Sequence, residues 1–263
     1  MFYNYFMAEN GNLNTLGRKI FFLHPSGITQ NLIISELAQE EFEVYSVRDE
    51  VKLRNVLKKY PDAIVFANIN EGMKEHAWEE WIQEIKKDPE TAGVDIGIIA
   101  SGNNQTAKQK YIDQLNVRCG FTVVKPDTVS VIKQLNVLLN NVNAKGRRKY
   151  IRAVMDKDAH TTVNLPINGT FVNGVIKDIS VVGFSCSFAD DLKLTKNKLF
   201  KDIQLRLQTL LIKAEGIVFG SRMDGEEKVY VFLMTQRVDS SEKAKIRKYI
   251  QTLLQSRMDH EFK

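Results

Sequence analysis

Three closely spaced arginines, Arg147, Arg148 and Arg152, are the residues of this sequence best suited to binding an anion. They lie in the segment KGRRKYIR, directly after an asparagine-rich stretch. Each guanidinium group offers five N–H donors in a rigid fork, which fits phosphate oxygens and the acceptor edge of guanine. The alternative is that these arginines are solvated charges on a linker.

A second short motif follows in the segment DISVVG, where Asp178, Ser180 and Gly183 form D-x-S-x-x-G. It combines a carboxylate acceptor, a small hydroxyl group and a residue without a Cβ, which permits close backbone approach or a positive φ. The same residues could instead form an Asx or Ser turn with the glycine at a bulge, and bind nothing.

The elements before the arginines alternate between strand and helix. Apolar runs predict five strands at 19–24, 42–47, 62–68, 94–100 and 121–125. Segments with helical spacing of apolar residues separate them, and Asp49 is expected to cap the helix that follows the second strand. This order predicts an α/β doubly wound, flavodoxin-like first domain.

From Ala153 onward the apolar period changes from 3.6 to 2. Six alternating runs are separated by turn signals such as Asn168-Gly169 and Asp224-Gly225, which predicts an all-β small antiparallel barrel. Residues 240–258 then predict an amphipathic C-terminal helix. The expected division is an N-terminal tail (1–17), the α/β domain (18–143), an arginine-bearing linker (144–152) and the barrel with its helix (153–263).

Arg148 and Arg152 form R-x-x-x-R, and this motif precedes D-x-S-x-x-G on a small barrel after a joint. In this combination residues 145–240 resemble the PilZ family of cyclic di-GMP receptors. The resemblance implies that the chain binds cyclic di-GMP, without catalysis and without a cofactor. The residues expected to bind it are Arg147, Arg148, Arg152, Asp178, Ser180 and Gly183.

Each of these residue types suits part of that ligand. Arginine can pair with a phosphate, or bond to guanine O6 and N7. Asp178 would accept from the N1–H and N2–H₂ edge of guanine, and Ser180 would bond to the base or a phosphate. Arg147 adds a third cation, which favours an intercalated dimer of the ligand.

Residues 18–143 resemble a response-regulator receiver domain, through the order of elements, the segment PDAIVFANIN and Lys125-Pro126. Phosphotransfer in a receiver needs an aspartate after the third strand and acidic metal ligands after the first. Here the third strand ends with Ala67, at the position that matches the phosphoacceptor, and Asn68, and the first strand ends at His24. The sequence therefore predicts a receiver-like domain without phosphotransfer, used for docking, dimerisation or interdomain contact.

Composition and charge narrow the function classes. The chain has 263 residues, of which 43% are hydrophobic and 26% charged, as in globular proteins. Residues 1–143 carry a net charge of −3 (15 Lys+Arg, 18 Asp+Glu), and residues 144–263 carry +8 (22 against 14). The basic half is therefore expected to meet an anion. No apolar run of membrane-spanning length occurs, and the two cysteines fit a cytoplasmic protein.

The expected function is a cyclic di-GMP receptor that converts binding into an interdomain rearrangement. It would control an unidentified downstream protein with a motility, polysaccharide or virulence output. An enzyme is not expected, because the sequence has no Ser-His-Asp set, zinc-ligand spacing, P-loop or acidic metal cluster. Two alternatives remain: a nucleic-acid-binding protein that uses the basic half, or a PilZ-like interaction module that binds no ligand. Nucleic acid is disfavoured because no row of stacking aromatic residues occurs.

Overall fold

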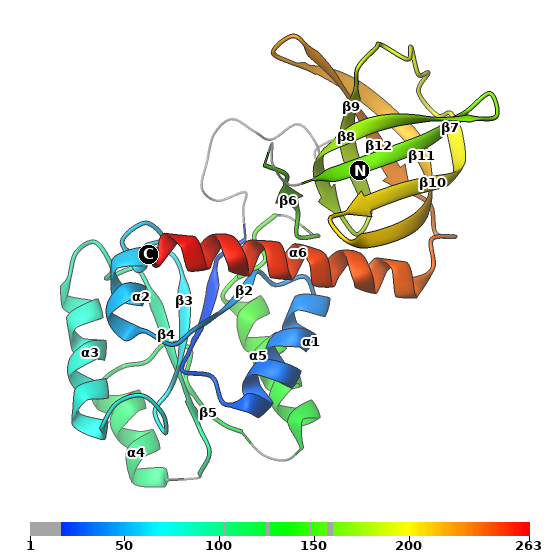
Figure 1. Ribbon diagram of the computed structural model, residues 1–263. Helices are drawn as coiled ribbons and strands as arrows, with labels where there is room; N and C mark the ends of the chain where they lie inside the picture. Colours follow the sequence, from blue (N-terminus) through cyan, green and yellow to red (C-terminus); the bar gives the residue numbers. More distant parts are fainter. Residues whose placement is uncertain (1–16, 103, 125–126, 148, 157–159) are drawn as a thin grey trace. The chain divides into compact units, whose positions relative to one another are not determined.

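The computed structural model describes residues 17–102, 104–124, 127–147, 149–156 and 160–263 (Figure 1). These residues form two compact units. The first contains the described residues up to Lys149 together with Gln255–Lys263, and the second is Tyr150–Leu254. Arg148 and Lys125 lie outside the described residues, and the finer domain limits expected from the sequence stay predictions.

The first unit has a five-stranded parallel sheet in the order β2-β1-β3-β4-β5. Its strands are β1 (Ile20–Leu23), β2 (Val44–Val47), β3 (Ile64–Asn68), β4 (Asp95–Ala100) and β5 (Phe121–Val123). The helices are α1 (Ile34–Gln39), α2 (Glu50–Leu57), α3 (Glu75–Lys87), α4 (Gln105–Gln109) and α5 (Thr128–Asn141), with π-helical segments at Thr29–Ile33 and Lys110–Gln114. Helices α1 and α5 cover one face, and α2, α3 and α4 cover the other (Figure 1). The predicted doubly wound fold is confirmed.

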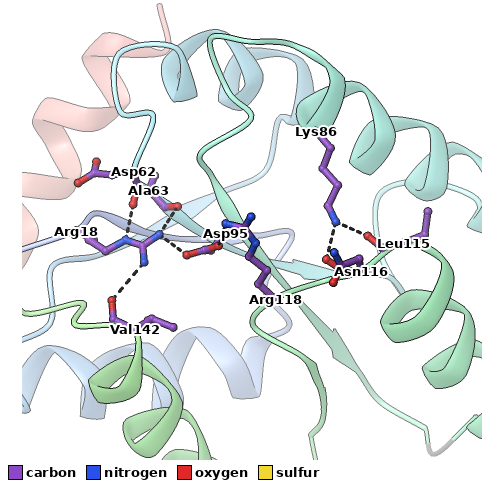
Figure 2. A network of polar contacts seen from close by, with 9 residues as sticks. All are labelled: Arg18, Asp62, Ala63, Lys86, Asp95, Leu115, Asn116, Arg118 and Val142. Atoms are coloured by element: carbon purple, nitrogen blue, oxygen red, sulfur yellow. Dashed lines mark hydrogen bonds and ion pairs between the residues drawn. The ribbon is translucent and has the colours of Figure 1, made fainter.

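The amino ends of these parallel strands are joined by Arg18, which lies two residues before the start of β1 (Figure 2). Its Nη2 lies 2.7 Å from Asp95 Oδ2, at the start of β4, and its Nε donates to the carbonyl of Asp62, just before β3. Its Nη1 donates to the carbonyl of Val142, at the end of α5. Arg118 approaches the other oxygen of Asp95 at 3.4 Å. One arginine thus links the starts of two strands and the end of a helix. These contacts lie at the amino ends of the strands.

The second unit is a six-stranded antiparallel barrel, as the sequence predicts. The six barrel strands are β7 (Thr161–Ile167), β8 (Thr170–Ser180), β9 (Gly183–Phe188), β10 (Leu199–Leu207), β11 (Leu210–Asp224) and β12 (Glu227–Met234), and β6 (Ala153–Val154) is a short additional strand. The ladder runs β8-β7-β10-β11-β12-β9, and β9 pairs back with β8 to close it. The short strand β6 joins the far end of β8, and α6 (Ser240–Glu261) follows the barrel.

One expected strand is two strands in the structure. The run IQLRLQTLLIKAEGIVFG reads as one alternating segment, but it contains a hairpin at Gln208-Thr209 between β10 and β11. Gln208 adopts φ +56°, a conformation that turns usually assign to glycine or asparagine, so the composition carries no turn signal. By contrast, the expected turn at Asn168-Gly169 is confirmed, with φ +50° and +82° at the two residues.

The barrel core is filled by alternate residues of its strands. Phe184 of β9 stacks on Phe232 of β12 with ring centroids 4.9 Å apart, and Cys186 is fully buried beside them. Cys186 and Cys119 are both free and buried, and burial raises the pKa of the Cys119 thiol to about 12.

Among the described residues, no helix is both long and apolar enough to span a bilayer.

The loop after β9 is tied to the barrel through Asp191, which predicts a stability change at low pH. The Tyr230 hydroxyl, the Lys193 N–H and the Lys228 ammonium all bond to this carboxylate, which lowers its pKa from 3.8 to about 2. A lowered pKa gives stability that is present above about pH 4 and is lost as the pH falls towards 2. We expect the urea midpoint of Asp191→Asn to fall less over this range than that of wild type. Asp190→Asn, at the exposed neighbour, should behave as wild type, and identical profiles for all three proteins would contradict this role.

Candidate ligand-binding site

Asp178 lies on the outer face of the barrel because of a β-bulge. Ile176 of β8 points into the core and pairs with Cys186, but the register shifts between Ile176 and Asp178. Asp178 therefore pairs with Ser185, whose side chain faces away from the core residues Phe184 and Cys186. Simple alternation would have put Asp178 on the same face as Ile176.

The Asp178 carboxylate is buried, and its two oxygens have different surroundings. Only 5% of its side chain is exposed. The Ser185 hydroxyl donates to Oδ2, and Arg222 Nη2 lies 3.7 Å from that oxygen. Arg152 Nε lies 3.5 Å from Oδ1. Despite this proximity, Oδ1 is a buried oxygen that accepts no hydrogen bond from the residues that the structure describes. A buried acceptor without a donor is unusual and marks a place where a donor from another molecule would be stabilised.

Arg152 reaches Asp178 because β6 pairs with the end of β8. Val154 pairs with Asp178, so Arg152 is held just before the start of this short ladder. Arg147, by contrast, is exposed and belongs to the first unit, and Arg148 lies outside the described residues. The structure therefore brings Arg152 to Asp178, while the contribution of the other two arginines stays a prediction.

Ser180 and Gly183 shape the β8–β9 hairpin next to Asp178. Ser180 is 3% exposed, and its hydroxyl donates to the carbonyl of Gly183 at 3.2 Å. A Cβ on Gly183 would lie 2.3 Å from the carbonyl oxygen of Phe232, so only glycine allows β9 to approach β12 this closely. The expected close backbone approach is thus present at Gly183, without a positive φ. Direct contact of either residue with a ligand stays a prediction.

Sequence reasoning missed Arg222, which comes from β11. Ile212, Ala214 and Val218 point into the core, and alternation would put Arg222 on that same face. A register shift between Val218 and Gly220 reverses the alternation, so that Arg222 pairs with Val229 on the outer face. No motif in the sequence signals this shift. Ser185 was missed too, although its position two residues after Gly183 in an alternating strand placed it on the outer face.

The carboxyl ends of the strands in the first unit carry residues that are joined by hydrogen bonds. Ala67, at the position of a receiver's phosphoacceptor, is fully buried. The Asn68 amide donates to the carbonyl of His24 at 2.9 Å, and His24 Nε2 lies 3.0 Å from Glu50 Oε2. Within the described part of the chain, no group of three or more His, Cys, Asp or Glu residues could hold a metal ion.

Comparisons with known proteins find likeness in solved structures alone. No protein-family model matches the chain, and no curated protein matches its sequence. The YcgR–c-di-GMP complex from Escherichia coli matches over 44% of this chain and 50% of that one, with 14% identity and a TM-score of 0.39. The K. pneumonia MrkH–c-di-GMP complex matches over 43% and 55%, with 21% identity and a TM-score of 0.39. The match thus spans about half the length of YcgR and of MrkH.

A separate match concerns receiver domains. A response regulator from Desulfuromonas acetoxidans matches over 47% of this chain and 98% of that chain, with 16% identity and a TM-score of 0.38. Different parts of the chain are thus similar in structure to YcgR and MrkH, both solved with c-di-GMP, and to a response regulator.

The chemistry available around Asp178 is recognition of a ligand that carries both N–H donors and acceptor or anionic groups. A carboxylate accepts two parallel N–H bonds, and the two neighbouring guanidinium groups donate to phosphate or to the O6 and N7 atoms of guanine. Both arginines lie beyond hydrogen-bond distance of the carboxylate, at 3.5 and 3.7 Å.

Proposed function

We propose that the second unit binds cyclic di-GMP on the outer face of the barrel, at Asp178. The observation that supports this proposal is the buried Oδ1 of Asp178, which has no donor among the described residues and lies beside the Arg152 guanidinium. The N1–H and N2–H₂ edge of guanine supplies two donors at the spacing of a carboxylate. A phosphate at the same place would be repelled by the carboxylate charge, so Asp178 selects the base.

The R-x-x-x-R motif provides the cations for the rest of the ligand. Arg152 is already beside the carboxylate, and Arg148 precedes Arg152 by four residues in the sequence. The arginines of the first motif would neutralise the two phosphates of the ligand, while Asp178 of the second motif would bind a guanine. Arg147 would add a third cation and favour an intercalated ligand dimer. No step of this binding breaks or forms a covalent bond, so the role is that of a receptor and not of an enzyme.

The output follows from where the arginines lie in the chain. Arg147 belongs to the first unit and Arg152 to the second. Binding of one ligand by residues of the connecting segment and of the barrel would restrict the conformations of that connection. We propose that this conformational change acts on an unidentified downstream protein. The controlled process would be motility, surface polysaccharide or virulence.

Titration calorimetry of the full chain with cyclic di-GMP tests the proposal. We expect wild type to bind, and Arg152→Ala to bind at least tenfold more weakly because a charge-assisted contact is lost. Arg206→Ala is the matched control, since Arg206 is exposed on the barrel strand β10 and its Nε donates to the nearby carbonyl of Gln208.

The proposal fails if wild type does not bind cyclic di-GMP, or if Arg152→Ala and Arg206→Ala bind equally well. Binding of the ligand to wild type with no discrimination against cyclic di-AMP would also contradict it, because Asp178 is proposed to accept from guanine and adenine lacks those donors.

A further inference from the structure

On the outer face of the barrel, a row of small residues lies between Asp178 and Arg222. The side chain of Arg222 extends over this row. Asp178 pairs with Ser185, Ser185 with Val231, and Val231 with Gly220. Arg222 starts on β11, three strands from Asp178, and its guanidinium still comes within 3.7 Å of Asp178 Oδ2. Its side chain therefore extends over the outer face of β12 and β9, above residues no larger than valine.

This placement is held by rigid elements. Arg222 is positioned by the ladder between β11 and β12, and the shift at Val218–Gly220 turns it outward. Its side chain is 26% exposed, so the guanidinium is partly covered yet reachable from solvent. Arg152, in contrast, precedes the two-residue strand β6. The barrel thus presents one arginine that is built into the sheet and one from the connecting segment.

We propose that Arg222 is a base-recognition residue that donates to the guanine held by Asp178. This inference rests on the proposed binding of cyclic di-GMP. A guanine held by Asp178 would lie next to the Arg222 guanidinium, whose Nη2 is 3.7 Å from Oδ2 of that carboxylate. A guanine paired with a carboxylate through N1–H carries its O6 on the adjacent ring carbon. O6 and N7 form the acceptor pair that an arginine fork binds with two parallel hydrogen bonds.

The consequence is a division of tasks between two residues on one base. Asp178 would take the donor edge of guanine, and Arg222 the acceptor edge. Adenine has an amino group in place of O6, so a donor of the base would face the N–H donors of Arg222. Adenine also has no proton on N1, so it would offer no N1–H to Asp178. Selectivity for guanine would then come from two strands of the barrel, independently of the arginines in the connecting segment.

Titration calorimetry with cyclic di-GMP of wild type, Arg222→Ala, Arg222→Lys and the control Arg206→Ala tests this inference. We expect Arg222→Ala to bind at least tenfold more weakly, and Arg222→Lys to recover less than threefold of that loss because lysine has no fork. Arg206→Ala should bind within twofold of wild type. Thermal unfolding checks each variant, since removing Arg222 takes a cation from the buried Asp178.

The outcomes separate this inference from the proposed function. If wild type does not bind, the function itself fails. If wild type binds and Arg222→Ala binds equally well or more tightly, Arg222 is only a counter-ion of Asp178 and the inference is wrong. Full recovery by Arg222→Lys would mean a point-charge contact to phosphate, which also overturns the assignment to the base.

Discussion

Asp178→Ala should weaken cyclic di-GMP binding by a factor of about 100 or more. The substitution leaves the N1–H and N2–H₂ donors of guanine without acceptors, and each hydrogen bond to a charged group contributes about 1.5–3 kcal/mol. It also removes the anion that holds the side chains of Arg152 and Arg222 at the site. Titration calorimetry at constant salt measures the affinity directly.

The control for this prediction must keep the barrel folded. Alanine would leave two guanidinium groups near a buried position without a counter-ion, which can destabilise the fold. Asp178→Asn also removes the charge but keeps the shape and one acceptor oxygen, so it should destabilise the barrel less than Asp178→Ala and lose only part of the affinity. Circular dichroism and thermal unfolding of both variants establish that they are folded. Wild-type affinity in folded Asp178→Ala would move the ligand away from this carboxylate.

Gly183→Ala should destabilise the barrel by about 3 kcal/mol or more, through steric overlap with the main chain. The added Cβ would lie 2.3 Å from the carbonyl oxygen of Phe232, a backbone atom that cannot rotate away. Relief requires β9 and β12 to separate, which breaks the ladder in which Gly183 pairs with Leu233. Urea-induced unfolding of the full chain, followed by fluorescence and circular dichroism, measures the loss.

Gly220→Ala is the matched control for that substitution. Gly220 lies on β11 in the same barrel, and nothing comes within 4 Å of a Cβ built on it. Its unfolding midpoint should therefore stay close to that of wild type. Equal midpoints for the two variants would show that β9 and β12 adjust without cost, and that the glycine of the motif has another purpose.

These two predictions give different roles to residues of the D-x-S-x-x-G motif. Asp178 faces outward and offers a carboxylate oxygen that has no donor within the described part of the chain. Gly183 and Ser180 hold the hairpin that carries it, through a close strand contact and a hydroxyl bond across the turn. Loss of binding in Gly183→Ala would therefore accompany a loss of stability, whereas Asp178→Asn separates the two effects.

Local patterns were enough to predict both folds. Alternation of apolar runs and helical segments in the first half indicated a doubly wound sheet, and the change to period two at Ala153 indicated the barrel. Asp49 was identified as a helix cap from its type and place, and its side chain accepts from Lys52 N at 2.9 Å. Such signals depend on neighbours in the sequence, and each element carries its own.

The composition of the candidate site depended on tertiary structure. Register shifts before Asp178 and before Gly220 turn Asp178 and Arg222 to the outer face, against the alternation of their own strands. A bulge forms where two paired strands differ in length by one residue, so its position is a property of the pair and not of either segment. Arg222 lies three strands away from Asp178 in the barrel, and only closure of the sheet brings its guanidinium to that carboxylate.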